Sequence, residues 1–149
     1  MTALAFERFS YTYPGGAAPA LRDVSLAIEP GAFVVVAGLS ASGKSTLIRA
    51  ACGLVPHFHG GEAAGTVRVG PLDTREHGPG ELSAHCGTLL QDPETQVVMN
   101  AVRSEIALPL EHRGLSASAV ARGVEEAALA LGVAHLLDRP THELSGGEL

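Results

Sequence analysis

Residues Gly38–Ser45, with the sequence GLSASGKS, decide the fold of this chain. The segment matches the pattern GxxxxGK[ST] at every fixed position. Its glycines allow the backbone to curl, so that successive N–H groups face one concave anion site. A helix that begins near Lys44 adds the partial positive charge of its N-terminus. The segment therefore predicts a phosphate-binding loop in which Lys44 meets the β- and γ-phosphates and the Ser45 hydroxyl is a ligand of Mg²⁺.

The nucleotide contacts expected from this loop come from consecutive residues. They are Gly38, Ser40, Ala41, Ser42, Gly43, Lys44, Ser45 and Thr46. A phosphate loop by itself does not distinguish a kinase, a GTPase and a transport ATPase.

The flanking sequence provides the strand and the helix that such a loop requires. Residues Ala32–Ala37 (AFVVVA) form a continuous apolar run, which predicts a strand covered on both faces. From Lys44 the sequence predicts a helix that stops at Gly53. Gly87–Leu90 (GTLL) predicts a second buried strand, and the Pro-, Gly- and charge-rich residues 71–84 predict a surface loop.

Further strands are indicated by alternation of apolar and polar residues. Leu4, Phe6 and Arg8 are predicted on one face of a strand, with Phe9 on the other. Residues 24–28 alternate clearly, and residues 66–69 suggest another strand.

From about Val97 onward the chain is rich in Ala and Leu at helical spacing. One helix face is predicted to carry Val120, Val124, Ala127, Ala128 and Leu131. Gly132 is the expected helix stop, and residues 134–137 predict a short further helix. The fold class is therefore α/β: a P-loop NTPase core with an N-terminal antiparallel β subdomain and an α-helical insertion.

Composition limits the possible partners. The chain has 149 residues, 46% of them hydrophobic, and carries 10 basic against 16 acidic side chains, with a net charge of −6. Lys44 is its only lysine. This acidic balance argues against direct binding to nucleic acid or to anionic lipid. No secretory signal or membrane span is evident, so we expect a cytoplasmic protein that reaches a membrane only through a partner. Cys52 and Cys86 are expected to be unpaired thiols.

A second motif lies at Leu144–Glu148 (LSGGE). Alone, this sequence is also typical of an ordinary helix cap. Together with a phosphate loop about a hundred residues upstream, it resembles the signature of the ATP-binding cassette (ABC) ATPases. The resemblance implies that ATP and Mg²⁺ are bound between two ABC ATPase subunits. Ser145, Gly146 and Gly147 of one subunit would then close over the γ-phosphate held by the other.

The resemblance also implies roles for two residues outside these motifs. Gln91 lies in LQDP (residues 90–93), where the family places a glutamine that contacts Mg²⁺ or the attacking water. Tyr13 lies where the family carries the aromatic ring that stacks on adenine, although core or surface packing is the alternative.

A finer resemblance is to the energy-coupling factor and cobalt-importer branch. It rests on QDPETQ (91–96), VRSEI (102–106) and PHFHGG (56–61). The implied function is an ATP-binding subunit that couples ATP binding and hydrolysis to import of a micronutrient. The implied partners are a second ABC ATPase subunit, the same or related, and an integral membrane transport subunit. The chain itself would lie peripherally on the cytoplasmic face of the cell membrane. Arg103 and Glu105 are candidates for that contact, and a solvated helix face is the equal alternative.

The family's Walker B strand, with its Mg²⁺-binding Asp and catalytic Glu, lies downstream of the signature. We therefore expect residues 1–149 to be a partial ABC domain without its C-terminal core strands, and inactive alone in hydrolysis. Its parts are 1–96 (β subdomain and P-loop core), 97–143 (helical subdomain) and 144–149 (signature start). The alternatives are a non-hydrolysing nucleotide-binding fragment and a soluble non-transport ABC ATPase. His57 and His59, with Glu62 nearby, lack a third metal ligand at helical spacing.

Overall fold

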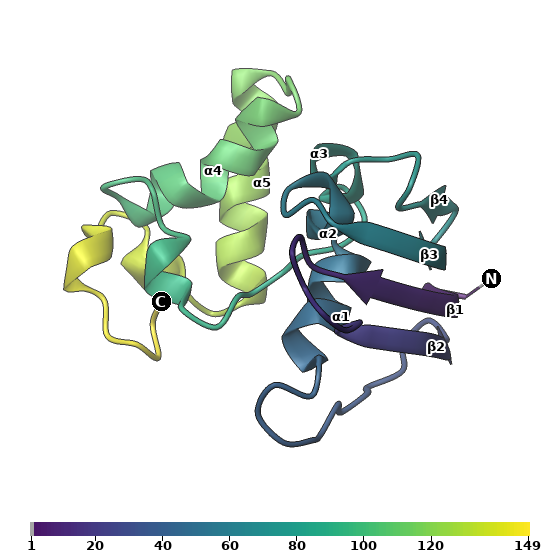
Figure 1. Cartoon of the computed structure of the whole chain (residues 1–149). Coiled ribbons are helices and arrows are strands. Elements are labelled where there is room, and N and C mark those ends of the chain that lie inside the picture. The colour runs from purple at the N-terminus through teal and green to yellow at the C-terminus, as the bar shows by residue number, and fades with distance from the viewer. Residues whose placement is uncertain (1) are drawn as a thin grey trace. The chain divides into compact units, whose positions relative to one another are not determined.

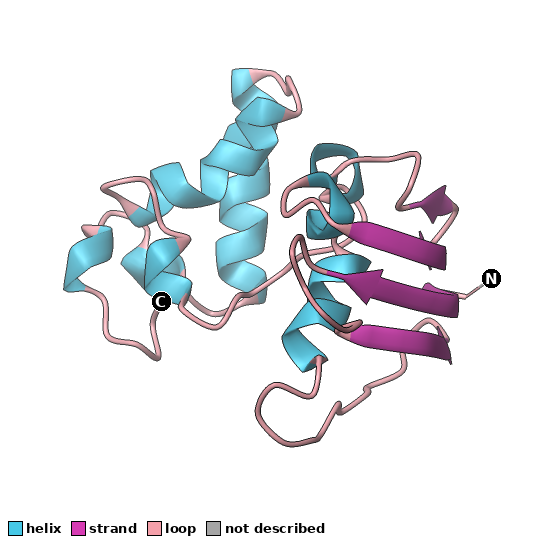
Figure 2. Cartoon of the chain, viewed as in Figure 1, coloured by secondary structure: helices cyan, strands magenta, loops and turns pink. Residues whose placement is uncertain are grey.

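The computed structural model describes residues 2–149 as two compact units, one extending to Thr88 and the other spanning Leu89–Leu149. Strands occur in the first unit, whereas the second is helical (Figure 2). Each unit is described on its own below. The predicted subdivision at residues 96 and 143 stays a prediction.

The first unit is built on a four-stranded antiparallel sheet with the strand order β2-β1-β3-β4 (Figure 1). The strands are β1 (Leu4–Thr12), β2 (Leu21–Ile28), β3 (Glu62–Val69) and β4 (Leu72–Asp73). The sheet confirms the predicted N-terminal antiparallel β subdomain and the three strands expected from alternation.

A bulge in β1 corrects the predicted faces of that strand. Arg8 has a φ of 46°, and the register of β1 against β2 shifts between Phe6 and Phe9. A bulge adds one residue to a strand and so reverses the alternation beyond it. Phe6 and Phe9 are consequently both 2% exposed in the same core, whereas Arg8 is exposed. The prediction that placed Phe6 with Arg8 and opposite to Phe9 is therefore wrong.

Two helices, α1 (Lys44–Ala51) and α2 (Leu54–His57), pack against this sheet. The core that they share with β1, β2 and β3 comprises Phe6, Phe9, Tyr11, Leu21, Ala50, Ala51, Val55 and Val67. Helix α1 confirms the predicted helix after the phosphate loop, and Gly53 after it has the φ of 73° expected of a stop.

Residues 71–84 are more ordered than the predicted surface loop. They contain β4 and the short helix α3 (Pro79–Leu82), whose Leu82 side chain is fully buried. Burial of the apolar Leu82 side chain holds this segment in place. The Pro- and Gly-rich composition of residues 71–84 does not predict this contribution.

The two predicted buried strands are not formed. Residues 32–37 carry no strand, and Phe33 is 93% exposed. Residues 87–90 likewise carry no strand, and Leu89 is 75% exposed. An apolar run favours burial, but a strand also needs a neighbour that pairs with its N–H and C=O groups. None of the strands in the described residues 2–149 pairs with either segment.

The second unit is a small helical assembly. Its elements are η1 (Pro93–Thr95), α4 (Val102–His112), α5 (Ala117–Ala130), η2 (Ala134–Leu136) and η3 (Thr141–Glu143). The predicted α-helical insertion is confirmed. No helix in the described part of the chain is both long and apolar enough to span a membrane.

The core of the second unit includes most of the predicted helix face. Val120, Val124 and Ala128 are buried together with residues of α4 and η2. Leu131 is 78% exposed, however, because α5 ends at Ala130 and the chain turns at Gly132 with a φ of 72°. The predicted face therefore extends one residue beyond the helix, to Leu131, which lies outside the core.

The contrast between Phe9 and Phe33 provides a stability test on residues 1–149. We expect Phe9→Ala to lower the free energy of unfolding by about 3–5 kcal/mol, because it removes a buried ring. Phe33→Ala is the matched control and should change it by less than about 0.5 kcal/mol. Urea unfolding measures both values. An equal loss in the two variants would contradict the assignment of the core.

Candidate functional site

Two glycines shape the phosphate loop. Gly43 precedes α1 with a φ of 93°, and a Cβ atom there would lie 2.6 Å from the carbonyl oxygen of Ala20. At Gly38, a Cβ would lie 2.9 Å from Ser42 Oγ. Positive φ and close approach both favour glycine. The loop is thus pressed against the end of the turn that joins β1 to β2.

Lys44 closes the loop on itself. Its Nζ donates hydrogen bonds to the carbonyl oxygens of Gly38 at 2.9 Å and Leu39 at 2.6 Å, and lies 3.3 Å from Ser42 Oγ. An ammonium group has three donors and no acceptor, so these three oxygens match its capacity. A phosphate oxygen would compete for the same donors.

A cavity of about 290 Å³ lies beside the loop. Its lining consists of Tyr13, Ala20, Ala41, Ser42, Gly43, Lys44, Ser45, Thr46 and Arg49. The lining includes two cationic side chains and no carboxylate. Because unlike charges attract and α1 begins at this point, the cavity is suited to an anionic ligand.

Most of the nucleotide contacts predicted in the first unit meet at this cavity. Ser45 is exposed in the first turn of α1, and Thr46 is 6% exposed beneath it. Gly38 contacts Lys44 from the start of the loop, and Ser40 is exposed on the loop. The individual roles of these residues stay predictions.

Tyr13 belongs to the same site. It follows β1 directly, and its hydroxyl oxygen lies 3.2 Å from Thr46 Oγ1. Arg49 donates a hydrogen bond from Nη1 to this oxygen at 3.0 Å. The structure thus places the predicted adenine-stacking residue beside the phosphate loop. Its stacking on adenine stays a prediction.

Sequence reasoning missed Arg49. Thr46 and Arg49 are three residues apart in α1, which places them on one face of the helix. That spacing was a usable signal, but the contact with Tyr13 joins residues 36 positions apart in the chain.

Gln91 lies in the second unit, exposed and just before η1. The loop around it is held by Gln96, whose Oε1 accepts a hydrogen bond from the Leu90 N–H at 2.7 Å. Thr95 donates from its hydroxyl to the Asp92 carbonyl, also at 2.7 Å. The second glutamine of QDPETQ therefore shapes the loop that presents the first. Contact of Gln91 with Mg²⁺ or water stays a prediction.

The LSGGE segment forms a turn in which Glu148 makes one half of a capping box, because its carboxylate reaches back to the Ser145 N–H. Glu148 Oε2 accepts hydrogen bonds from the Ser145 backbone N–H at 2.9 Å and from Ser145 Oγ at 2.7 Å. The Glu148 N–H donates in turn to the Ser145 carbonyl at 2.9 Å. Ser145, Gly146 and Gly147 are exposed, and Arg139 forms an ion pair with Glu148 at 3.2 Å. The hydrogen bond from the Ser145 hydroxyl is the main cause that lowers the pKa of Glu148.

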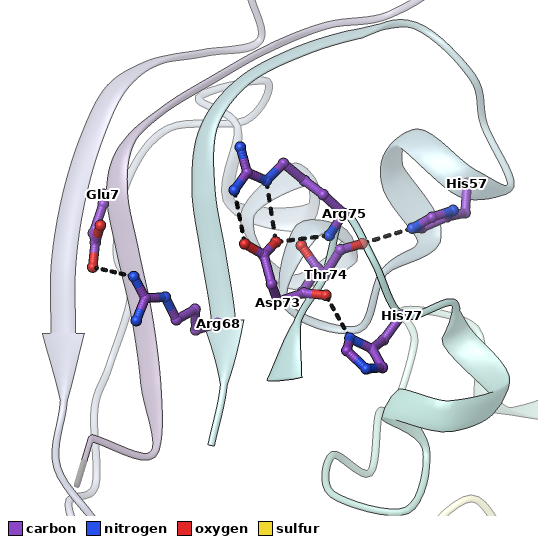
Figure 3. A network of polar contacts seen from close by, with 7 residues as sticks. All are labelled: Glu7, His57, Arg68, Asp73, Thr74, Arg75 and His77. Carbon is purple, nitrogen blue, oxygen red and sulfur yellow. Dashed lines mark hydrogen bonds and ion pairs between the residues drawn. The ribbon is translucent and has the colours of Figure 1, made fainter. Parts of the chain in front are cut away.

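His57 and His77 have backbone partners in the first unit (Figure 3). His57 Nε2 lies 2.6 Å from the Thr74 carbonyl oxygen, and His77 Nδ1 lies 3.1 Å from that of Asp73. The hydrogen bond from the Arg75 side chain holds the pKa of Asp73 below its ordinary value. In residues 2–149 no group of three or more His, Cys, Asp or Glu side chains is arranged to hold a metal ion. The network fastens β4 and the turn after it.

Arg103 and Glu105, the predicted partner contacts, both stabilise the second unit. Glu105 Oε2 accepts hydrogen bonds from the N–H groups of Val98 and Met99, at 3.0 and 2.7 Å. Arg103 forms ion pairs with Glu125 at 2.7 Å and Asp138 at 3.4 Å. These contacts give both residues a structural role whether or not a partner binds.

Comparison of the sequence with known proteins identifies the family of this chain. A protein-family model described as ABC transporter matches residues 21–149. A putative ABC transporter ATP-binding protein of Streptomyces avermitilis is 44% identical over 143 residues, covering 96% of this chain and 26% of that protein. A putative ABC transporter ATP-binding protein of Methanosarcina acetivorans is 40% identical over 139 residues, covering 93% of this chain and 22% of that protein. The chain thus spans about a quarter of the length of these relatives.

A solved structure shows the same arrangement of elements. It is cbiO1 from Clostridium perfringens, described as part of the ABC transporter complex cbiONQ. The TM-score is 0.80 at 27% sequence identity, and the match covers 99% of this chain and 57% of that one. The predicted fold class is confirmed by this match.

The close approach of Gly43 to Ala20 can be tested by adding a methyl group. Gly43→Ala combines an unfavourable φ with a backbone clash and should cost about 2–4 kcal/mol of unfolding free energy. Gly31→Ala is the matched control, because Gly31 has a φ of 78° but open space around it. It should cost about 1 kcal/mol. Equal costs in urea unfolding would mean that the loop does not press on Ala20.

The hydrogen bonds from Ser145 to the Glu148 carboxylate predict an acid-sensitive turn at Ser145. Because the folded-state pKa of Glu148 is lowered, its contribution is present above the ordinary glutamate pKa and is lost as pH falls through the folded value. A carboxyl ¹³C titration of Glu148 should show a midpoint below the ordinary value, and Ser145→Ala should raise that midpoint. A midpoint that Ser145→Ala leaves unchanged would argue against the hydrogen bond.

Proposed function

Because this chain belongs to the ABC transporter family, we propose that it is the ATP-binding part of a transport ATPase, with ATP and Mg²⁺ held at residues 38–46. The observation that carries the proposal is the Lys44 ammonium, placed on a glycine-shaped loop at the start of α1. Both a phosphate loop and a helix N-terminus bind anions through backbone N–H groups.

The residues present fit this ligand. Lys44 would exchange the carbonyl oxygens of Gly38 and Leu39 for phosphate oxygens. Because phosphate is negatively charged, these hydrogen bonds would be stronger than those to the neutral carbonyls. Ser45 would contribute its hydroxyl to Mg²⁺, a cation that would neutralise phosphate charge. Tyr13, which lines the same cavity, would receive the adenine ring.

The signature and Gln91 are proposed to act on a nucleotide held by a second ABC subunit, identical or related. Ser145, Gly146 and Gly147 would supply donors to its γ-phosphate. The Ser145 hydroxyl now donates to Glu148, so that closure would require Ser145 to exchange this carboxylate for phosphate. Gln91 would orient Mg²⁺ or the attacking water.

Hydrolysis needs a further group. The cavity lining contains no Asp or Glu that could accept a proton from water. We therefore propose that turnover depends on a carboxylate outside this lining, as in the family's Walker B segment. A non-hydrolysing nucleotide-binding role is the second candidate, and the same lining supports it.

The likeness to cbiO1 supports coupling to import, with a micronutrient as the proposed cargo and a position on the cytoplasmic face of the membrane. The proposed contact with a membrane subunit lies within residues 97–140. In the second unit, α4 and α5 border a groove of about 620 Å³, lined among others by Met99, Ala107 and Val120. Such an apolar groove is suited to a helix of a partner protein.

Loss of the Lys44 charge tests the nucleotide site. Lys44→Ala should weaken Mg·ATP binding roughly 10- to 100-fold, since charge-assisted hydrogen bonds contribute about 1.5–3 kcal/mol. Arg22→Ala is the control, because it removes one exposed positive charge from β2. Calorimetric titration measures both. Equal affinities in Lys44→Ala and the unmodified chain would refute the proposed function.

A further inference from the structure

Arg49 provides the starting observation, because it is a second cation in the nucleotide cavity. It lies on α1, five residues after Lys44, and lines the cavity with the phosphate loop. Arg49 takes part in none of the ion pairs seen among the described residues, such as those of Arg68, Arg103 and Arg139. Its charge therefore lies at this cavity without a carboxylate partner among the described residues.

The contact of Arg49 is directed at one atom. Its Nη1 donates to the Tyr13 hydroxyl oxygen at 3.0 Å, and that oxygen is 3.2 Å from Thr46 Oγ1. Because the phenol oxygen accepts from Arg49, its own proton is available to Thr46. Thr46 is 6% exposed and hence fixed in place. The tip of the Tyr13 ring is thereby held by two side chains of α1.

The body of the Tyr13 ring contacts two other rings. The Tyr11 ring lies edge-on to Tyr13, with centroids 4.8 Å apart and planes at 80°. Tyr11 is fully buried and donates its hydroxyl proton to the Gly60 carbonyl at 2.6 Å. The His59 ring makes a second edge contact at 6.2 Å. Without these contacts, the half-exposed Tyr13 side chain would be mobile and would lose rotamer freedom when a ligand binds. Fixing the ring in advance removes this entropic cost and so favours affinity.

From these contacts we propose that Arg49 is a positioning residue for the nucleobase. Its guanidinium holds the Tyr13 ring in the orientation that receives adenine. The proposal rests on the proposed function, because it requires Tyr13 to contact the base. Helix α1 then serves both ends of the nucleotide: Lys44 and Ser45 at its first turn bind phosphate and Mg²⁺, while Thr46 and Arg49 orient the Tyr13 ring.

The test compares a ligand that has a base with one that has none. Calorimetry on the full chain measures the dissociation constants of Mg·ATP and of magnesium tripolyphosphate. Arg49→Met should weaken ATP roughly three- to tenfold, the value of one hydrogen bond, and change tripolyphosphate less than twofold. Tyr13→Phe, which keeps the ring and removes the acceptor, should weaken ATP by a similar factor.

The double variant Arg49→Met/Tyr13→Phe should bind ATP no more weakly than the single variants, because both remove the same contact. Multiplying effects would overturn the proposal, since Arg49 would then act independently of Tyr13. Equal loss of ATP and tripolyphosphate would also overturn it, by making Arg49 a phosphate ligand. Unchanged ATP affinity in Arg49→Met with an unchanged unfolding midpoint would exclude any positioning role.

The Lys44→Ala variant distinguishes a failure of the proposed function from a failure of the Arg49 proposal. If Lys44→Ala binds ATP as well as the unmodified chain, the phosphate loop is not the site, whatever Arg49 does. If Lys44→Ala weakens ATP binding but Arg49→Met does not, only the proposed positioning role of Arg49 is contradicted.

Discussion

The hydrogen bonds from the Lys44 ammonium to the carbonyl oxygens of Gly38 and Leu39 are the interaction on which the site depends. They satisfy both carbonyls within the loop and hold the ammonium group at the start of α1, where we propose that phosphate binds. The loop is fixed from behind by Gly43, which leaves no room for a side chain beside Ala20. The same turn carries Tyr13, and the phosphate site and the proposed base platform are therefore positioned together.

The two proposed anion sites are held by different internal contacts. In the first, the Lys44 ammonium binds carbonyl oxygens of the loop. In the second, the carboxylate of Glu148 accepts hydrogen bonds from the Ser145 hydroxyl and N–H. Each proposed site would therefore lose an existing contact on binding a phosphate. Affinity reflects the difference between the two contacts and not the full strength of the new one.

Local chemistry explains what the sequence predicts well and what it misses. The phosphate-loop sequence, α1, the positions of β1, β2 and β3, and the contact of Ser145 with Glu148 all follow from residues close together in the chain. The strand expected at residues 32–37 is absent because pairing needs a remote partner, which apolar composition does not reveal. The bulge at Arg8 and the contact of Arg49 with Tyr13 likewise depend on neighbours far apart in the sequence. Alternation and motif spacing carry no information on such pairs.

The most direct test of the central claim, that the Lys44 loop is a nucleotide site, is an amide NMR titration of the full chain with Mg·ATP. The account predicts that the largest shift changes fall on the N–H groups of Gly43, Lys44 and Ser45, with Tyr13 ring signals changing in the same titration. Saturable changes confined to residues outside the loop, or no changes at millimolar ATP, would contradict it.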